Sequence, residues 1–226
     1  MSAAPRTLLF CTTYHADAEA WRARERRWLD YYRELPLRHD AVFLIDDASP
    51  YVTDDADVVT LDALPARLPD GPRAFVYRFA THEGRHGLYG HRGWWRSFLF
   101  SLTIARTLGF ARIVHVESDA FLLSRRIVDR FNALDDGWTA FWFPAYGVPE
   151  PALQVIAEDQ FDAMATFATR TLDNLTQDLA ENMLPFTRIE RNFAGNRYGE
   201  MRGRIPGYAD YACQVNSPGL VTRYRG

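Results

Sequence analysis

The sequence contains no lysine, so all 26 of its basic side chains are arginines. This absence excludes a Schiff-base lysine and the lysine of a P-loop, and the pattern G-x-x-x-x-G-K-[ST] does not occur. The first apolar run, residues 7–13, is followed by Tyr14 and His15 rather than by a glycine-rich loop. The chain is therefore expected to be neither a P-loop ATPase nor a Rossmann dehydrogenase, methyltransferase or nucleotidyltransferase.

Cysteine, excess charge and long apolar runs are also scarce. The two cysteines, Cys11 and Cys213, are too few for a disulfide framework or a C-x-x-C site, and buried reduced thiols are expected. The balance of 29 acids against 26 bases gives a net charge of -3, which disfavours nucleic acid or an anionic membrane as the main partner. No apolar stretch has the length of a transmembrane segment or a signal peptide. We expect a cytoplasmic protein and leave peripheral membrane contact open.

Apolar runs alternate with helical patterns over the first 135 residues. Because these runs are continuous, the strands are expected to be buried on both faces of a mostly parallel sheet. The pattern predicts an α/β fold with a Rossmann-like, mostly parallel central sheet and helices on both faces. Strands are expected at residues 7–13, 41–45, 57–61, 74–79, 111–116 and 139–143, and helices at 16–33, 94–108, 124–134, 157–168 and 174–183.

Carboxylates follow two of the expected strands. Asp46 and Asp47 come after the run 41–45, and Glu117-Ser118-Asp119 comes after the run 111–116. Ligands of parallel α/β sheets sit beyond the carboxyl ends of the strands, and hard oxygen ligands suit Mg²⁺ or Mn²⁺. The alternatives are a helix cap for the triplet and an Asx turn for the aspartate pair.

Residues 7 to about 134 resemble the nucleotide-binding half of family-2-type GT-A glycosyltransferases. The resemblance rests on Cys11-Thr12-Thr13-Tyr14, on Ile45-Asp46-Asp47-Ala48-Ser49-Pro50, and on the segment 105–110 that leads to Glu117-Ser118-Asp119. It implies a single GT-A domain over residues 1–226, with a nucleotide-sugar-binding half at 7–134 and an acceptor-side half at 135–226. In one departure, Glu117 stands where the family usually has aspartate.

The resemblance also implies roles for single residues. Thr12, Thr13 and Tyr14 would border the nucleotide base, and Asp46 or Asp47 would contact base or ribose. Glu117 and Asp119 would hold Mn²⁺ or Mg²⁺, with Ser118 between them at the nucleotide sugar.

The segment 81–93 is rich in glycine, histidine and arginine and is expected to be a surface loop. Arginine can pair bidentately with phosphate oxygens, so Arg85, Arg92 and Arg96 are candidates for binding the donor. Solvation of these side chains is the alternative.

An inverting transferase needs a base to deprotonate the acceptor hydroxyl. Asp159, which follows the apolar run 152–156, is the first candidate, and Asp210 is the second. An acidic pair at the start of a helix, Glu158-Asp159, is the alternative.

These observations favour a glycosyltransferase that moves a sugar from a nucleotide-diphosphate donor to a hydroxyl acceptor, namely a glycan or a lipid-linked intermediate. The alternative is a GT-A-like module that binds a nucleotide sugar without turnover, since fold alone does not decide function.

Overall fold

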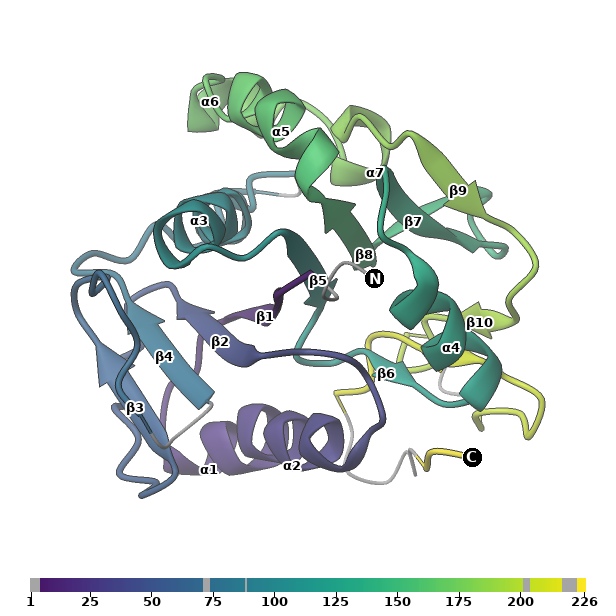
Figure 1. Ribbon diagram of the computed structural model, residues 1–226, viewed down its shortest axis with the longest axis horizontal. Coiled ribbons are helices and arrows are strands. Elements are labelled where there is room, and N and C mark those ends of the chain that lie inside the picture. The colour runs from purple at the N-terminus through teal and green to yellow at the C-terminus, as the bar shows by residue number, and fades with distance from the viewer. Residues whose placement is uncertain (1–4, 71–73, 88, 201–203, 217–222) are drawn as a thin grey trace.

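A computed structural model of the chain describes residues 5–70, 74–87, 89–200, 204–216 and 223–226. Its centre is an eight-stranded sheet with the order β3-β4-β2-β1-β5-β8-β7-β9 (Figure 1). The strands are β1 (Thr7–Thr13), β2 (Ala41–Asp46), β3 (Val58–Leu61), β4 (Ala74–Arg78), β5 (Arg112–Val116), β7 (Trp138–Phe143), β8 (Val148–Ala157) and β9 (Arg188–Glu190).

The direction of the strands defines two edges of this sheet. The five strands from β3 to β5 pair in parallel, while β8 is antiparallel to both of its neighbours, β5 and β7. β9 pairs in parallel with β7, so only β8 runs against the other strands of this sheet. We call the edge where β1, β2 and β5 end the carboxyl edge, and the opposite one the amino edge. The predicted mostly parallel sheet is confirmed.

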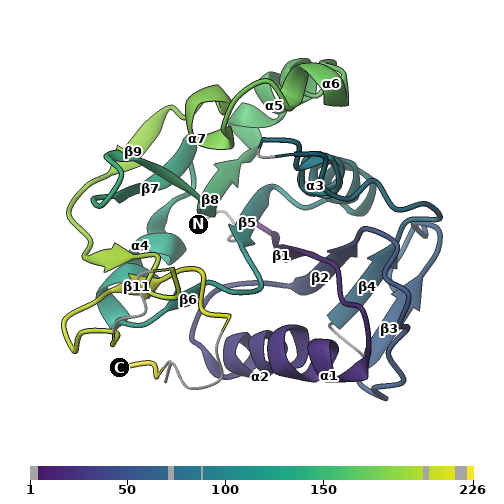
Figure 2. The ribbon, with the colours of Figure 1, turned by 180° about the vertical axis from the view of Figure 1, so that it is seen from behind.

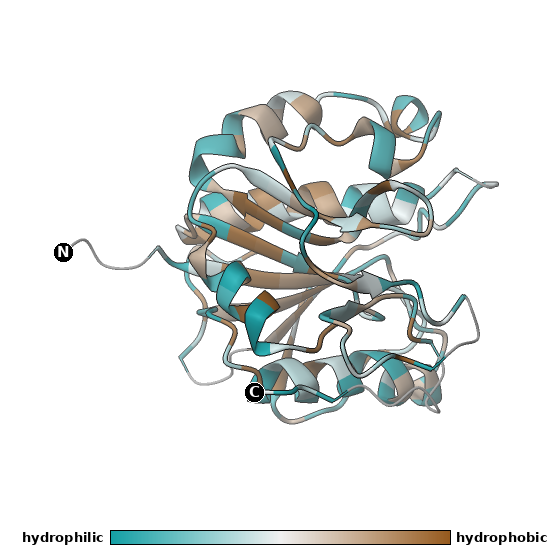
Figure 3. Cartoon of the chain, turned by 90° about the vertical axis from the view of Figure 1, so that its right-hand side faces the viewer, coloured by the Kyte–Doolittle hydropathy of each residue, from teal (hydrophilic) through white to brown (hydrophobic). Residues whose placement is uncertain are grey.

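Helices cover both faces of the sheet, as predicted. Figure 3 shows the apolar strands as a layer between helices above and below. The helices are α1 (Ala18–Trp21), α2 (Arg27–Glu34), α3 (Arg92–Leu108), α4 (Arg125–Ala133), α5 (Phe161–Phe167), α6 (Leu172–Leu175) and α7 (Ala180–Met183), with a π-helical turn at Arg22–Arg26 and a 3-10 turn at Glu158–Gln160. Among the described residues, no helix is long and apolar enough to span a membrane.

Alternate residues of β1 pack against opposite layers. Leu9 and Cys11 belong to the core beneath α2 and α4, while Leu8 and Phe10 belong to the core beneath α3 and α5. All four side chains are fully buried, which is why the run reads as continuously apolar in the sequence. Each buried aliphatic or aromatic side chain stabilises the fold by about 1.5–3 kcal/mol relative to exposure.

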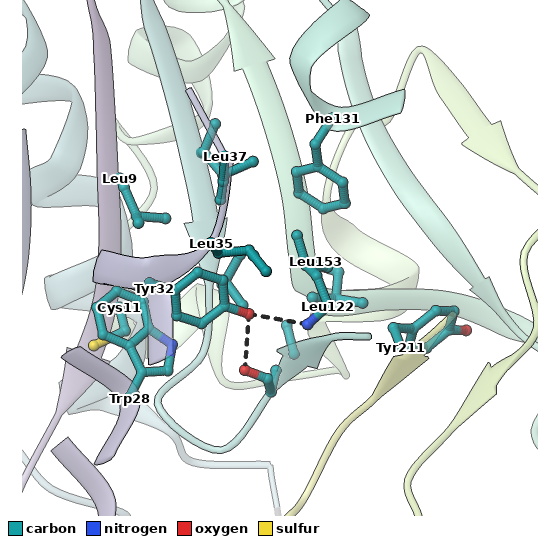
Figure 4. Close-up of a cluster of buried hydrophobic side chains, with 14 of the residues drawn as sticks. Leu9, Cys11, Trp28, Tyr32, Leu35, Leu37, Leu122, Phe131, Leu153 and Tyr211 are labelled. Carbon is teal, nitrogen blue, oxygen red and sulfur yellow. Dashed lines mark hydrogen bonds between the residues drawn. The ribbon is translucent and has the colours of Figure 1, made fainter. Parts of the chain in front are cut away.

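Tyr32 of α2 connects the first core to the segment after β5 (Figure 4). Its hydroxyl donates to the carbonyl of Ala120 at 3.1 Å and accepts from the backbone N–H of Leu122 at 3.2 Å. Leu122 lies in β6 (Phe121–Leu122), which forms a small three-stranded sheet with β10 (Gly195–Asn196) and β11 (Tyr211–Ala212) beside α4 (Figure 2). The segment that contains Glu117 and Asp119 is therefore held by Tyr32 of α2 and by the small sheet that follows it.

Helix ends follow the expected signals in two places. Ser124 caps α4, since its side chain accepts from the backbone N–H of Ile127, and Gly109 ends α3 with φ of 68°. The helix expected at 174–183 is wrong: the chain forms α6 and α7 instead. Asp178 accepts from the backbone N–H of Leu179 at 2.7 Å and from Asn182 at 3.0 Å, which starts a separate helical turn.

Candidate functional site

A cleft of about 460 Å³ opens at the carboxyl edge of the sheet. It lies between the end of β1, the turn after β2, the segment 82–91, the start of α3 and the π-helical turn. The residues that line it are Thr12, Thr13, Tyr14, Arg24, Asp47, His82, Gly84, Arg85, His91, Gly93, Trp94 and Ser97. A larger hollow of about 650 Å³ lies at the amino edge, against Arg6 and Asp40, and contains none of the predicted site residues.

The two neighbouring aspartates after β2 have different roles. Asp46 is 1% exposed and accepts from the backbone N–H of Ser49 at 3.1 Å and from the Ser49 hydroxyl. This is an Asx turn, with Ala48 at a φ of 59°. Burial raises the pKa of Asp46, although the hydrogen bonds from Ser49 act in the opposite direction. Asp46 therefore shapes the turn and does not line the cleft.

Asp47 lines the cleft and anchors the segment that closes it. Its carboxylate accepts from the backbone N–H of Gly84 at 2.8 Å and from Arg96, and His82 Nδ1 lies 3.0 Å from Oδ2. Tyr14, 44% exposed, packs against the His82 ring with centroids 4.3 Å apart. The contacts of Asp47 thus hold an exposed aromatic pair at the mouth of the cleft.

Gly93, at the start of α3, makes room for this carboxylate. A Cβ atom at position 93 would lie 2.1 Å from Asp47 Oδ2, far inside van der Waals contact. Gly93→Ala is therefore expected to displace Asp47 and to lower the free energy of unfolding by about 1–3 kcal/mol, as overpacking does. Urea unfolding measures the effect. Gly207→Ala is the matched control, because a Cβ there meets nothing within 4 Å. Equal stability of the two variants would contradict this role of Gly93.

Glu117 is held by side chains from three elements. Its oxygens accept from the Thr12 hydroxyl of β1 at 2.9 Å and from the indole N–H of Trp94 in α3, and His115 Nε2 of β5 lies 2.9 Å from Oε1. Burial acts to raise the pKa of Glu117, but attraction to His115 and the hydrogen bonds from His115 and Trp94 outweigh it and hold the pKa below its ordinary value. Glu117 is thus a buried, ionised carboxylate whose Oε1 accepts from Trp94 and lies beside His115, while Oε2 has only the Thr12 hydroxyl that it shares with Oε1.

Behind Glu117, the polar contacts continue into the core. His115 Nδ1 lies 3.4 Å from Gln154 Nε2 of β8, and the Gln154 carbonyl oxygen accepts from the indole N–H of Trp138 at 2.7 Å. Both His115 and Gln154 are fully buried. A buried polar network of this kind fixes the orientation of its members.

Asp119 faces an arginine. It is 6% exposed, and its Oδ2 lies 3.7 Å from Nη2 of Arg24, which comes from the π-helical turn. Burial raises the pKa of Asp119, and the charge of Arg24 opposes this rise. Ser118, between the two acids, is buried and directs its hydroxyl to the carbonyl of Thr12 at 3.4 Å.

Carboxylate oxygens at positions 117 and 119 have the chemistry that Mn²⁺ or Mg²⁺ requires. Their contacts fit such an ion poorly, because Glu117 Oε1 is already contacted by Trp94 and His115 and Asp119 faces a guanidinium. Within the part of the chain that the structure describes, no three His, Cys, Asp or Glu side chains are grouped so that they could hold a metal. The divalent ion stays a prediction.

Of the predicted arginines, Arg85 lines the cleft and donates to the carbonyl of Gly87 at 3.0 Å. Arg96 donates to Asp47 and to the carbonyl of Thr81, so it supports the cleft wall. Arg92 instead pairs with Glu83 and Asp173 on the outside of the segment.

The first predicted base, Asp159, lies at the wrong edge of the sheet. Because β8 is antiparallel, Ala157 pairs with Arg112 at the start of β5, and Asp159 follows at the amino edge. Its exposed carboxylate accepts from the backbone N–H of Gly137 at 3.0 Å. The structure therefore places Asp159 away from the cleft, and its role as the base stays a prediction.

Asp210 is also a structural residue. It is 3% exposed and accepts from the Ser124 hydroxyl, from Arg126 and from the backbone N–H of Ala194 at 2.7 Å. These contacts join the small sheet to the start of α4. The oxygens of Asp210 thus accept from donors of the protein itself, and its role as a base stays a prediction.

Arg24, His82 and Trp94 are among the cleft residues that sequence reasoning missed. Arg24 belongs to the run R-A-R-E-R-R, which is typical of a solvated helix face. Trp94 lies at the start of an apolar helical pattern, and His82 lies in a segment typical of a surface loop. A signal for Trp94 is its place directly after Gly93, in the first turn of α3.

No family model matches the sequence, and no curated protein matches it. Among solved structures, a glycosyltransferase involved in the glycosylation of the major capsid of PBCV-1 is similar, with a TM-score of 0.48 and 8% identity over 94% of each chain. A likeness of this size assigns neither an activity nor any residue to the chain.

Proposed function

We propose that this chain is a glycosyltransferase that takes a sugar from a nucleoside diphosphate and transfers it to a hydroxyl acceptor. The observation that carries the proposal is the meeting of β1, Asp47 and the start of α3 around one cleft at the carboxyl edge, beside Glu117 and Asp119. Ligands of open α/β sheets bind at this edge. The acidic strand ends noted in the sequence border the same cleft.

The walls of the cleft offer suitable chemistry for each part of the donor. The exposed Tyr14 ring, packed on His82, is suited to stack on a nucleotide base. Arg24 and Arg85 offer guanidinium groups for phosphate oxygens. The start of α3, a helix of 17 residues, adds the partial positive charge of a helix N-terminus.

The acceptor is proposed to be a glycan or a lipid-linked saccharide that approaches the turn 144–147. This turn follows β7, which ends at the carboxyl edge, and it contains Tyr146, whose side chain is 65% exposed. Exposed aromatic rings are suited to stacking on sugars.

A nucleotide-sugar-binding module without turnover is the second candidate. Asp159 lies at the amino edge, and Asp210 is held by Arg126. Glu150 lies in the first part of β8, at the carboxyl edge, but is 2% exposed and accepts from Arg197 at 2.8 Å. These three carboxylates are therefore poorly placed to act as a base.

Calorimetric titration with UDP, GDP, CMP and dTDP sugars, followed by product analysis with and without acceptor glycans, tests the proposal. We expect one donor class to bind and to lose its sugar when the acceptor is present. Binding without hydrolysis or transfer would assign the module instead. Failure of all four nucleotides to bind would contradict both candidates.

A further inference from the structure

Arg24 lies beside Glu117-Ser118-Asp119, where the phosphates of a nucleoside-diphosphate donor would need a positive charge. Its Nη2 lies 3.7 Å from Asp119 Oδ2, and its side chain lines the cleft and is 39% exposed. The buried Nε has no hydrogen-bond partner among the residues that the structure describes. The guanidinium is therefore held beside Asp119 on one side, while the exposed part of the side chain faces the cleft.

The π-helical turn at Arg22–Arg26 explains how this arginine reaches the cleft. A widened turn accommodates one residue more than a regular α-helical turn. Arg24 contacts Asp119, while the next residue, Glu25, is fully buried and accepts from the Thr13 hydroxyl. Two successive residues of one helix thus both face the end of β1.

The charges around Arg24 keep its guanidinium in place. Desolvation disfavours its charged form, but the nearby carboxylates of Asp119, Glu25 and Glu117 outweigh this and raise the pKa of Arg24. The group therefore carries a permanent positive charge. A divalent ion beside Asp119 would have to displace it or bear like-charge repulsion at short range.

A nucleoside diphosphate needs positive charge at its phosphates, and arginine offers planar, paired N–H donors that match phosphate oxygens. We propose that Arg24, positioned by Asp119, takes the role of the divalent cation, so that the cleft binds a nucleoside diphosphate without metal. This inference rests on the proposed function, since it concerns the phosphates of the same donor. Arg24 contacts the ligand, and Asp119 is the positioning residue.

The first test compares binding of UDP and GDP to the unmodified chain in EDTA and in excess Mn²⁺ or Mg²⁺, by calorimetry. Because the cation is part of the protein, we expect the two Kd values to agree within about twofold, less than 0.5 kcal/mol. Binding that appears only with the metal would overturn the inference and leave the proposed function standing. Absence of binding under both conditions would overturn both.

The second test replaces the guanidinium. Arg24→Met keeps the aliphatic stem and removes the charge, so Kd for the same nucleoside diphosphate should rise by about ten- to a hundredfold, the usual effect of losing charge-assisted hydrogen bonds. Arg24→Lys keeps the charge but cannot donate bidentately, and an intermediate Kd is expected. The matched control is Arg22→Met, in the same turn but exposed. Binding by Arg24→Met with the Kd of the parent would overturn the inference. If this variant does not fold, the comparison of the parent in EDTA and in excess metal tests the inference on its own.

Discussion

Replacing Glu117 with alanine is expected to lower the free energy of unfolding by about 3–5 kcal/mol, because each buried polar group left without its partner costs about 1–3 kcal/mol. The variant leaves the Thr12 hydroxyl, the Trp94 indole and His115 without their shared acceptor in a buried site. Urea unfolding measures the loss. A carboxylate that served only as a metal ligand would contribute little to the stability of the metal-free chain.

Two comparisons make this prediction specific. Glu117→Gln keeps the size and one acceptor oxygen, so it should lose less stability than Glu117→Ala. Asp159→Ala serves as the control, because its carboxylate is exposed at the amino edge. A Glu117→Ala variant as stable as the control would show that the network around Glu117 has no structural role.

Replacing Glu25 with glutamine is expected to stabilise the chain at neutral and alkaline pH. Burial raises the pKa of Glu25 from 4.5 to about 7, although the hydrogen bond from Thr13 and the charge of Arg24 oppose the rise. The folded state then binds more protons than the unfolded state between these two pH values, so the stability of the parent falls as pH rises through this window. At pH 8 the gain for Glu25→Gln should be on the order of 3 kcal/mol.

The free energy of unfolding, measured as a function of pH, tests the direction of this effect. Parent and variant should have similar stabilities near pH 4, where Glu25 is protonated in both states, and should diverge up to about pH 7. The matched control is Glu19→Gln, an exposed glutamate of α1, which should show no such divergence. A constant difference between parent and Glu25→Gln at every pH would contradict the raised pKa.

The first half of the fold was predictable from the sequence because its strands are buried on both faces. Leu8 to Cys11 alternate between two cores, so an unbroken apolar run marks β1 as the centre of a covered sheet. The direction of β8 was not predictable from its own apolar run, since burial does not depend on strand direction. The turn 144–147 decides it, because four residues are enough for a hairpin but too few for a crossover.

The candidate site was predictable only as a location. The acids after the second and fifth strands were expected at one edge of the sheet, and Asp47, Glu117 and Asp119 do lie at that edge. The sequence did not show that Asp46 would turn toward Ser49, or that Arg24 would reach Asp119. Both depend on local backbone geometry, namely the positive φ of Ala48 and the π-helical turn.

The reversed direction of β8 also affects how this protein could change in evolution. The exposed turn 144–147 joins two paired strands at the carboxyl edge, so its length is independent of the crossover connections that set strand order. Extra residues in a surface loop cost little, because loop-closure entropy grows slowly with length. Insertions here would extend the carboxyl edge at β7 and β8 while β1, β2 and β5 stay unchanged. This hairpin can thus change in length without altering the strands that border the cleft.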